Sequence, residues 1–191
     1  IEVMPEFDLP GHNMSLLKLY PSMRDPEDQS FEVSVQGYSE NTLNPAMPDT
    51  SSILETVIDD LCKVFPGEYI HLGADEIAPG AWSESPLVDA LKAKHNLENS
   101  KDVASWFINK LSRRIESNNK KTAAWQEAED GHHHDEKTDK LLFSWQNLES
   151  GLNLARQGYK VVLCPAEHIY FDMVQSRNYA DRGANWAAVI P

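Results

Sequence analysis

The chain has almost no cysteine: among its 191 residues, only Cys62 and Cys164 carry a thiol. The two lie far apart and show neither Cys-x-x-Cys nor any other metal-ligand spacing. Cys62 stands in an apolar helical run and Cys164 ends a strand-like run, so both are predicted to be small buried side chains. The thiols therefore leave the cellular compartment open.

Long apolar runs and a surplus of positive charge are also missing. No stretch approaches the roughly 20 consecutive apolar residues that cross a bilayer, so no membrane span is predicted. The formal net charge of -13 repels phosphate backbones and disfavours a nucleic-acid partner. With 41% apolar and 25% charged residues, the composition is that of a globular protein with one substantial core.

A start methionine and a leader segment are absent as well. Residues 1–4 already have the apolar pattern of a strand, and a folded protein rarely begins inside a core strand. We therefore expect the chain to be a piece of a larger domain, with any targeting signal outside it.

Short apolar strands alternate with amphipathic helices along the chain. Strands are predicted at 1–4, 69–72, 122–125, 140–145 and 160–164, and helices at 52–64, 101–117 and 151–157. Ser52 and Glu55 have the spacing of a capping box, which places the start of the first helix at Ser52. The stretch 13–50 is rich in Pro, Ser, Asn and Asp, and a loop of that length is usually functional or a small subdomain.

This order of elements predicts a parallel sheet covered by helices, in the α/β class. The polar and aromatic candidates follow strand ends, where (β/α)8 barrels carry their active sites. An open doubly wound sheet would place them similarly, but no Gly-rich phosphate loop is present, so the barrel is favoured. A complete barrel needs about 250 residues. Residues 1–191 are therefore predicted to form one partial (β/α)8 TIM barrel domain, with about five strands and without the first strands and the last strand.

Asp75 and Glu76 are adjacent carboxylates directly after a buried strand. Hydrolysis of a glycoside needs an acid for the leaving oxygen and a group that stabilises the oxocarbenium-like transition state. Taken alone, two neighbouring acids in a loop are more often solvated surface residues.

The surrounding residues change that interpretation. His71–Glu76, with the sequence H-L-G-A-D-E, resembles the H-x-G-G-D-E motif of the family 20 glycoside hydrolases, the β-hexosaminidases and chitobiases. Residues 3–12 resemble the same family's V-x-P-E-x-D-x-P-G-H motif, and residues 35–45 look chitobiase-like. Ala74 stands where the family usually has Gly. The family's sugar-gripping Arg on the first strand, and its Trp and Glu on the last strand, have no counterpart here.

The resemblance implies a retaining, substrate-assisted hydrolysis of terminal N-acetylhexosamines, in which the substrate's acetamido oxygen is the nucleophile. Asp75 would orient the acetamido N–H, and Glu76 would be the general acid and then the base. The Tyr170 hydroxyl would hydrogen-bond the acetamido oxygen. His12 would lie near Glu76 and tune its proton affinity. No cofactor or metal is implied.

The same resemblance suggests five substrate-binding residues. Trp125 and Trp145 end consecutive strands, as do the tryptophans that wall the family's sugar pocket, and Trp186 is similar to a further stacking tryptophan of bacterial chitobiases. Asp172, in a Tyr-x-Asp motif, would bind a sugar hydroxyl, and Asp8 would orient its neighbours or be structural. The family likeness also implies chitin-derived oligosaccharides as substrates and a periplasmic or secreted location.

Two other functions stay open on the residues alone. A non-catalytic carbohydrate-binding module would keep the pocket without turnover. A glycosidase with a covalent intermediate would need a second carboxylate about 5 Å from Glu76, for which Asp172 is the candidate.

Other features are predicted to be structural. Trp82 and Trp106 are interpreted as packing residues, and His132–His134 as part of a solvated acidic loop. Because a five-stranded piece of a barrel leaves unpaired strand edges, the chain is expected to self-associate.

Overall fold

The structure, a computed structural model, describes residues 1–129 and 139–187. Within these ranges, five strands form a parallel sheet in the order β1-β2-β3-β4-β5. The strands are β1 (Glu6–Leu9), β2 (Tyr69–Gly73), β3 (Lys121–Trp125), β4 (Lys140–Ser144) and β5 (Lys160–Leu163). Each strand pairs with the next in sequence, as in part of a (β/α)8 barrel, and no strand order reverses as it would in a doubly wound sheet.

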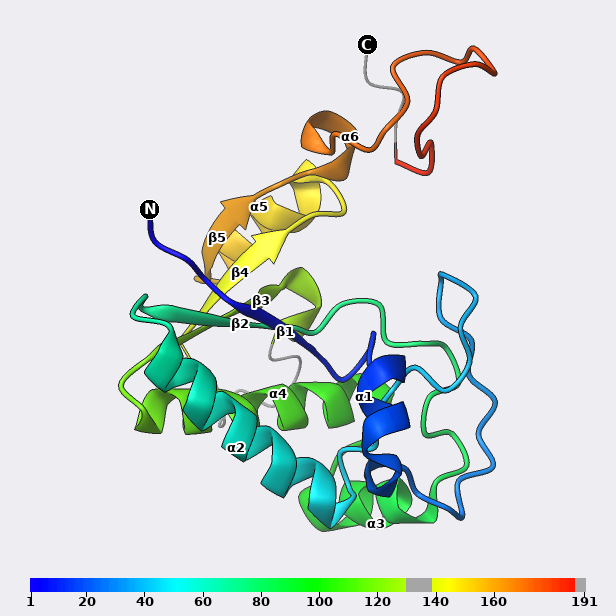
Figure 1. The fold of residues 1–191 in the computed structure, drawn as a ribbon, viewed down its shortest axis with the longest axis vertical. Coiled ribbons are helices and arrows are strands. Elements are labelled where there is room, and N and C mark those ends of the chain that lie inside the picture. Colours follow the sequence, from blue (N-terminus) through cyan, green and yellow to red (C-terminus); the bar gives the residue numbers. More distant parts are fainter. Residues whose placement is uncertain (130–138, 188–191) are drawn as a thin grey trace.

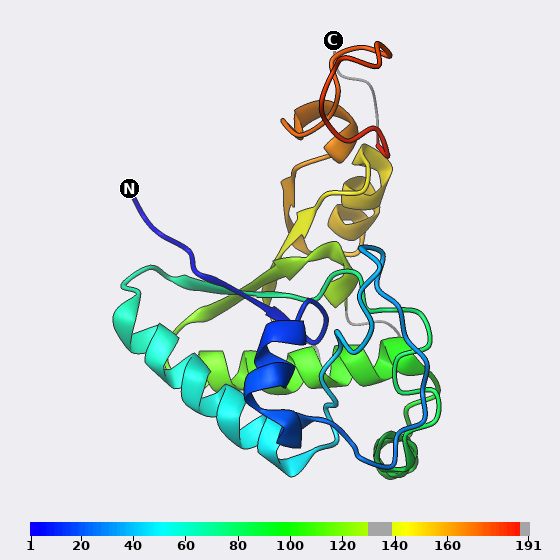
Figure 2. The same cartoon turned by 45° about the vertical axis from the view of Figure 1, so that its right-hand side comes forward.

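Helices connect the strands and cover the sheet (Figures 1 and 2). They are α1 (Met14–Leu19), α2 (Pro48–Val64), α3 (Pro86–His95), α4 (Ser100–Ser117), α5 (Leu148–Arg156) and α6 (Ala166–Ile169), with 3-10 turns η1 (Pro21–Met23) and η2 (Gln126–Ala128). Helices α2 and α4 pack against each other beneath β1–β3, and α5 packs on β4 and β5. Beyond α6, the chain extends away from the sheet (Figure 1).

Helix α4 illustrates how the sequence specifies these elements. Asn99 accepts a hydrogen bond from the backbone N–H of Asp102, whose side chain accepts one from the N–H of Asn99, which is a complete capping box. Phe107, Leu111 and Ile115 then recur on one face and are fully buried. That face packs against α2 and β3.

The main core lies between the sheet and the helices α2 and α4. Strand β2 contributes Ile70 and Leu72, and β3 contributes Ala124, all without exposed surface. Such continuous apolar runs are typical of parallel strands covered by helices. A smaller cluster surrounds Trp82, whose indole N–H donates to the Leu43 carbonyl at 3.1 Å, so its predicted packing role is confirmed.

The strand predicted at residues 1–4 is wrong: β1 is Glu6–Leu9. In the register of the pair, Glu6 lies opposite His71, and β2 begins only at Tyr69. Residues 1–3 therefore lie before the point where β2 begins, and no residue of β2 is beside them to pair with. Ile1 and Val3 are accordingly exposed in spite of their apolar side chains.

The first long helix also begins earlier than predicted. Helix α2 starts at Pro48, whose fixed φ and missing N–H suit the first helical position. Ser52 lies inside the helix and donates its hydroxyl to the Asp49 carbonyl. Helix α3 was not predicted, although Ser85 caps it and Pro86 opens it in the way that sequence rules describe.

Several smaller predictions are tested as well. Cys62 is buried, whereas Cys164 is only partly buried, which corrects the prediction for the second thiol. Trp106 packs against both apolar clusters, as expected of a packing residue. His132–His134 lie outside the described residues. Among the described helices, none has the length and apolar character to cross a membrane.

Candidate active site

The turn that follows β2 delivers the two adjacent carboxylates. Gly73 ends the strand at a φ of +65°, and a methyl group there would overlap Asp8 Oδ1. Ala74 and Glu76 then take φ values of 82° and 47°. Two non-glycine residues in the left-handed region within three positions indicate local strain, which recurs at functional sites. The backbone therefore bends sharply where Asp75 and Glu76 leave the sheet.

His12 joins these carboxylates from the loop after β1. Its Nε2 lies 3.4 Å from Asp75 Oδ2 and 3.4 Å from Glu76 Oε2. Asp8 Oδ2 is 4.0 Å from the same nitrogen. Gly11 allows the close approach of the two loops, because a Cβ at this position would lie 3.2 Å from the Asp75 carbonyl oxygen. The two sequence motifs thus form one cluster, and the predicted proximity of His12 to Glu76 is confirmed.

Asp8 lies at the base of this cluster and accepts a hydrogen bond from the Ala74 N–H at 3.2 Å. Burial, followed by the negative charge of Asp75, raises the pKa of Asp8 to about 9. At neutral pH, Asp8 is therefore protonated and can donate a hydrogen bond to Asp75. One ligand atom each of Asp8, His12 and Asp75 lie within 4.8 Å of one another, which would suit a cation.

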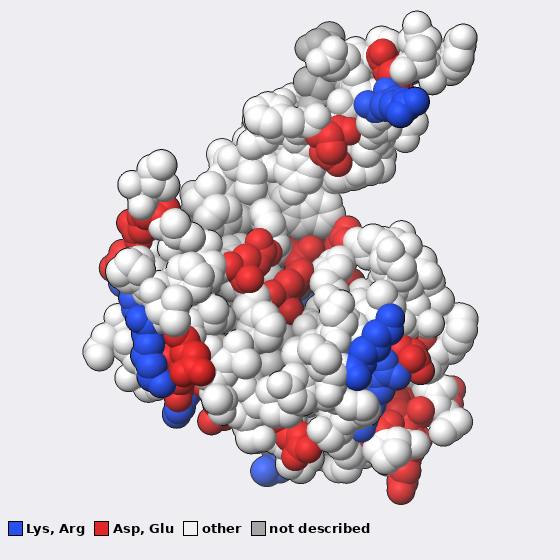
Figure 3. Space-filling view, viewed as in Figure 1, with Lys and Arg blue, Asp and Glu red and all other residues white. Residues whose placement is uncertain are grey.

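Aromatic side chains from three further segments face the carboxylates across a cavity of about 560 Å³. Trp125 ends β3, Trp145 directly follows β4, and Tyr170 follows α6. The cavity is lined by Val35, Gln36, Asp75, Glu76, Trp125, Trp145, Tyr170 and Trp186. Figure 3 shows acidic side chains gathered in a recess of the molecule. An apolar wall facing acidic groups can bind a sugar, whose rings have an apolar face and a polar rim.

The aromatic residues are held by one another and by carboxylates. Trp186 packs edge-on against Trp145 and Tyr170, with ring centroids 5.7 Å and 5.9 Å apart. The Trp125 indole N–H donates to Glu6 Oε1 at 2.8 Å. Burial is the largest of the causes that raise the pKa of Tyr170 to about 12, so its hydroxyl keeps its proton and can donate.

Gln36 is a site residue to which the sequence analysis assigned no role. Its Nε2 donates to Glu76 Oε2 at 2.6 Å from the long loop between η1 and α2. A tight turn presents it, since the Ser34 N–H donates to the Tyr38 carbonyl at 2.9 Å. The resemblance of residues 35–45 to chitobiases was the only sequence feature that pointed to this loop. Composition alone does not predict that a loop glutamine donates a hydrogen bond to a carboxylate of the site.

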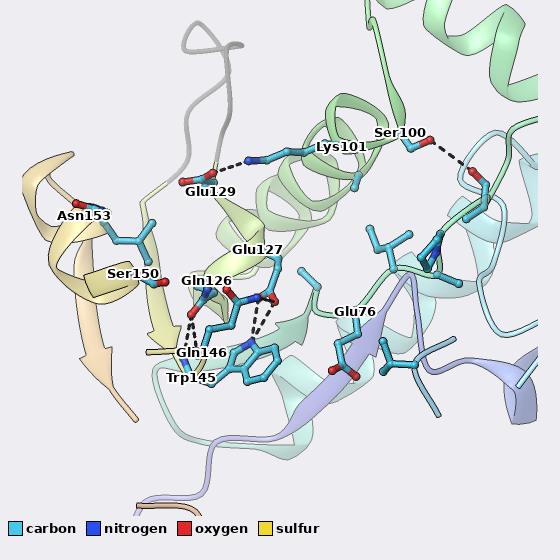
Figure 4. Close-up of a pocket in the computed structure, with 18 of the residues that line it drawn as sticks. Glu76, Ser100, Lys101, Gln126, Glu127, Glu129, Trp145, Gln146, Ser150 and Asn153 are labelled. Carbon is cyan, nitrogen blue, oxygen red and sulfur yellow. Dashed lines mark hydrogen bonds and ion pairs between the residues drawn. The ribbon is translucent and has the colours of Figure 1, made fainter. Parts of the chain in front are cut away.

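Glu127 was also missed. It belongs to η2, directly after Trp125, and lines a second cavity of about 880 Å³ together with Glu76 and Trp145 (Figure 4). Its carboxylate accepts the Trp145 indole N–H at 3.1 Å and 3.2 Å. Burial raises the pKa of Glu127 to about 7.

Most of the predicted site residues meet at the cavity, but not all. Asp75, Glu76, Tyr170 and the three tryptophans line it, while His12 and Asp8 support the carboxylates. Asp172 is exposed and does not line the cavity. Its charge contributes to the raised pKa of Tyr170.

Comparison with known proteins gives one consistent result. Residues 1–191 match the glycosyl hydrolase family 20 catalytic domain. A β-hexosaminidase of Vibrio furnissii is 35% identical over 194 residues, which cover 100% of this chain and 31% of that protein.

Solved structures agree with this match. The crystal structure of a family 20 exo β-N-acetylglucosaminidase from Vibrio harveyi, in complex with N-acetylglucosamine, has a TM-score of 0.91 and 33% identity, and it covers 100% of this chain and 30% of that one. A chitobiase from Flavobacterium johnsoniae has a TM-score of 0.77 and 28% identity, over 91% of this chain and 27% of the other. The chain thus spans less than a third of the length of each of these relatives.

Proposed function

Because the chain belongs to glycosyl hydrolase family 20, we propose that it supplies catalytic residues of an exo-acting β-N-acetylhexosaminidase. Such an enzyme removes terminal N-acetylhexosamines from oligosaccharides. The observation that carries the proposal is the pair Asp75 and Glu76 on one side of an aromatic cavity, with His12 Nε2 3.4 Å from both. A sugar-sized, water-excluding pocket with an acid at its wall is the minimum that glycoside hydrolysis requires.

The reaction proposed for this pocket uses the substrate's own acetamido group. Asp75 accepts the acetamido N–H and stabilises the positive charge that develops as the carbonyl oxygen bonds to the anomeric carbon. Glu76 donates its proton to the glycosidic oxygen while that bond breaks, and an oxazolinium ion remains. Glu76 then removes a proton from the water that opens this ion. The protonated Asp8 behind Asp75 supports the arrangement, because it offers Asp75 a hydrogen-bond donor in place of a second negative charge.

The aromatic residues position the group that reacts. Tyr170, with its pKa raised to about 12, donates a hydrogen bond to the acetamido oxygen. Trp125 and Trp145 enclose the acetamido methyl and an apolar sugar face, and their rings exclude water. The Nε2 atom of His12 lies 3.4 Å from both carboxylates, so it is close enough to hold a proton between them or to pass one from one to the other.

Chitin-derived oligosaccharides are the proposed substrates. The neighbour from Flavobacterium johnsoniae is a chitobiase, and the Vibrio harveyi structure contains N-acetylglucosamine. On this proposal the exposed Trp186 and the loop residue Gln36 lie at the cavity edge, where the next sugar unit of the oligosaccharide extends out of the pocket.

The test is release of 4-nitrophenol from its β-N-acetylglucosaminide by the intact protein and its variants. Asp75→Asn and Glu76→Gln should each lower kcat/KM by about a hundredfold or more, since each removes a group that acts in the transition state. Glu116→Gln, on the exposed face of α4, is the matched control and should leave turnover unchanged. An inactive protein that still binds N-acetylglucosamine would instead indicate a carbohydrate-binding module.

Inhibition by a thiazoline that mimics the oxazoline separates the mechanisms. Strong inhibition is expected if the acetamido group is the nucleophile. A covalent glycosyl–enzyme adduct, with no response to the thiazoline, would instead assign the nucleophile to a protein carboxylate.

A further inference from the structure

Trp145 lines both cavities, so its side chain forms part of the wall of each. It follows the last residue of β4 and is only partly buried. A partly exposed indole at a strand end has no dense packing on every side to hold it. Trp186 packs edge-on against one side of the ring, and the remaining support must come from outside the core.

Two residues of η2 divide this task (Figure 4). Gln126 Oε1 accepts the backbone N–H groups of Trp145 and Gln146 at 3.0 Å and 3.2 Å. Glu127 accepts side-chain donors, namely the Trp145 indole N–H at 3.1 Å and the Gln146 amide at 3.2 Å. Gln126 thus holds the chain after β4, whereas Glu127 holds the ring.

The choice of a carboxylate at position 127 needs an explanation. An amide could accept the same indole N–H without the cost of burying a charge. Burial is the largest cause that raises the pKa of Glu127 to about 7, and the charges of Asp75 and Glu76 raise it further. Lys101 of α4 pairs with Glu129, and the Lys140 ammonium of β4 donates to the Ala128 carbonyl at 2.9 Å. Glu127 therefore changes its charge near neutral pH, beside the pair proposed to be catalytic.

We propose that Glu127 is a positioning residue whose ionised carboxylate fixes the Trp145 indole and so tightens the pocket for the terminal sugar as pH rises. The hydrogen bond from the indole is charge-assisted when Glu127 is ionised and weaker when it is protonated. The effect on the sugar rests on the proposed function, whereas the anchoring of the indole does not.

Tryptophan fluorescence of the intact protein without substrate tests the anchoring. The wild type should show a transition with a midpoint near pH 7, and both Glu127→Gln and Trp145→Phe should abolish it. Glu127→Gln preserves the side-chain volume and an acceptor oxygen, so it tests charge and not folding. A transition that persists in Glu127→Gln overturns the proposal, whatever the activity of the protein.

Kinetics test the consequence for the sugar. Above the transition, Glu127→Ala should raise KM about tenfold with a smaller change in kcat, because a pocket wall binds substrate and transition state alike. Glu127→Gln should show only a small part of that rise in KM. It should also remove the part of the pH dependence of KM that Glu127 causes. An unchanged KM in a Glu127→Ala protein that unfolds at the wild-type temperature overturns the proposal.

Discussion

At the scale of single residues, Gly73 is the described glycine at which an added Cβ would meet the closest neighbouring atom. Its φ of +65° favours glycine, and a methyl group would overlap the Asp8 carboxyl. We expect Gly73→Ala to lower the free energy of unfolding by about 2–4 kcal/mol, through strain and overlap together, and to displace Asp8. Urea unfolding measures this. Gly158→Ala is the matched control: its φ is +90° and nothing lies near its Cβ position, so only about 1 kcal/mol of strain is expected.

If the two glycine variants lower the free energy of unfolding by the same amount, the overlap with Asp8 does not contribute to the loss. The comparison isolates one contact because both positions share the left-handed backbone.

Asp8 gives a prediction for the pH dependence of stability. Its pKa is about 9 in the folded protein and 3.8 as a free group, so the folded state keeps a proton that the unfolded state has released. Stability therefore falls as pH rises through that window. Asp8→Asn imitates the protonated acid and removes this slope. Between about pH 5 and about pH 8.5, we expect the stability of the variant relative to wild type to increase by about 1–3 kcal/mol, measured by urea unfolding. A constant difference would mean that Asp8 is ionised throughout.

Much of the candidate site was predictable at this scale, and the exceptions have physical causes. Asp75 and Glu76 were expected at the carboxyl edge of a parallel sheet because they follow a buried strand. The position of His12 near Glu76 was implied by the family resemblance. Gln36 and Glu127 contact the site through side-chain hydrogen bonds between loops, and such contacts cannot be predicted from the periodic pattern of apolar residues. Ala74 stands where the family usually has Gly, and its φ of +82° is a backbone property that composition does not reveal.

At the scale of elements, Asn99 and Ser52 test where the helices α4 and α2 begin. Asn99 caps α4 with a reciprocal bond to Asp102, whereas Ser52 lies inside α2. Asn99→Ala should lower the free energy of unfolding by about 1 kcal/mol, the usual loss for an N-cap. Ser52→Ala should change it by less than about 0.5 kcal/mol, since it removes only an exposed hydroxyl. Thermal or urea unfolding of both variants gives the comparison, and equal losses would contradict the assigned helix start.

The types of most elements were predictable, but their ends were less so. The capping-box pattern occurs both at Asn99, where α4 begins, and at Ser52, which lies inside α2. Helix α2 instead begins at Pro48. For β1, the apolar pattern of residues 1–4 was outweighed by register, because a strand needs a partner beside it. Local patterns therefore specify which element forms, and pairing and packing specify where it begins.

At the scale of the whole molecule, the sheet formed by residues 1–129 and 139–187 has two ends and does not close into a barrel. Strands β1 and β5 form these ends, and Val162 and Leu163 on β5 are exposed to 36% and 46%. An unpaired parallel strand with apolar side chains invites pairing with another chain. We therefore expect the 191-residue chain on its own to associate as its concentration rises, with light scattering as the measurement.

A pair of lysine substitutions locates the surface responsible for that association. Val162→Lys places a charge on the end strand and should reduce the average mass in solution, because a buried lysine would be left unpaired in any strand-to-strand contact. Leu19→Lys changes an equally apolar and more exposed residue on α1, away from β5, and should leave the mass unchanged (Figure 1). If both variants reduce association, general surface hydrophobicity causes it and not the strand edge. A wild-type chain that stays monomeric at every concentration would show that the sheet ends are protected by the chain itself.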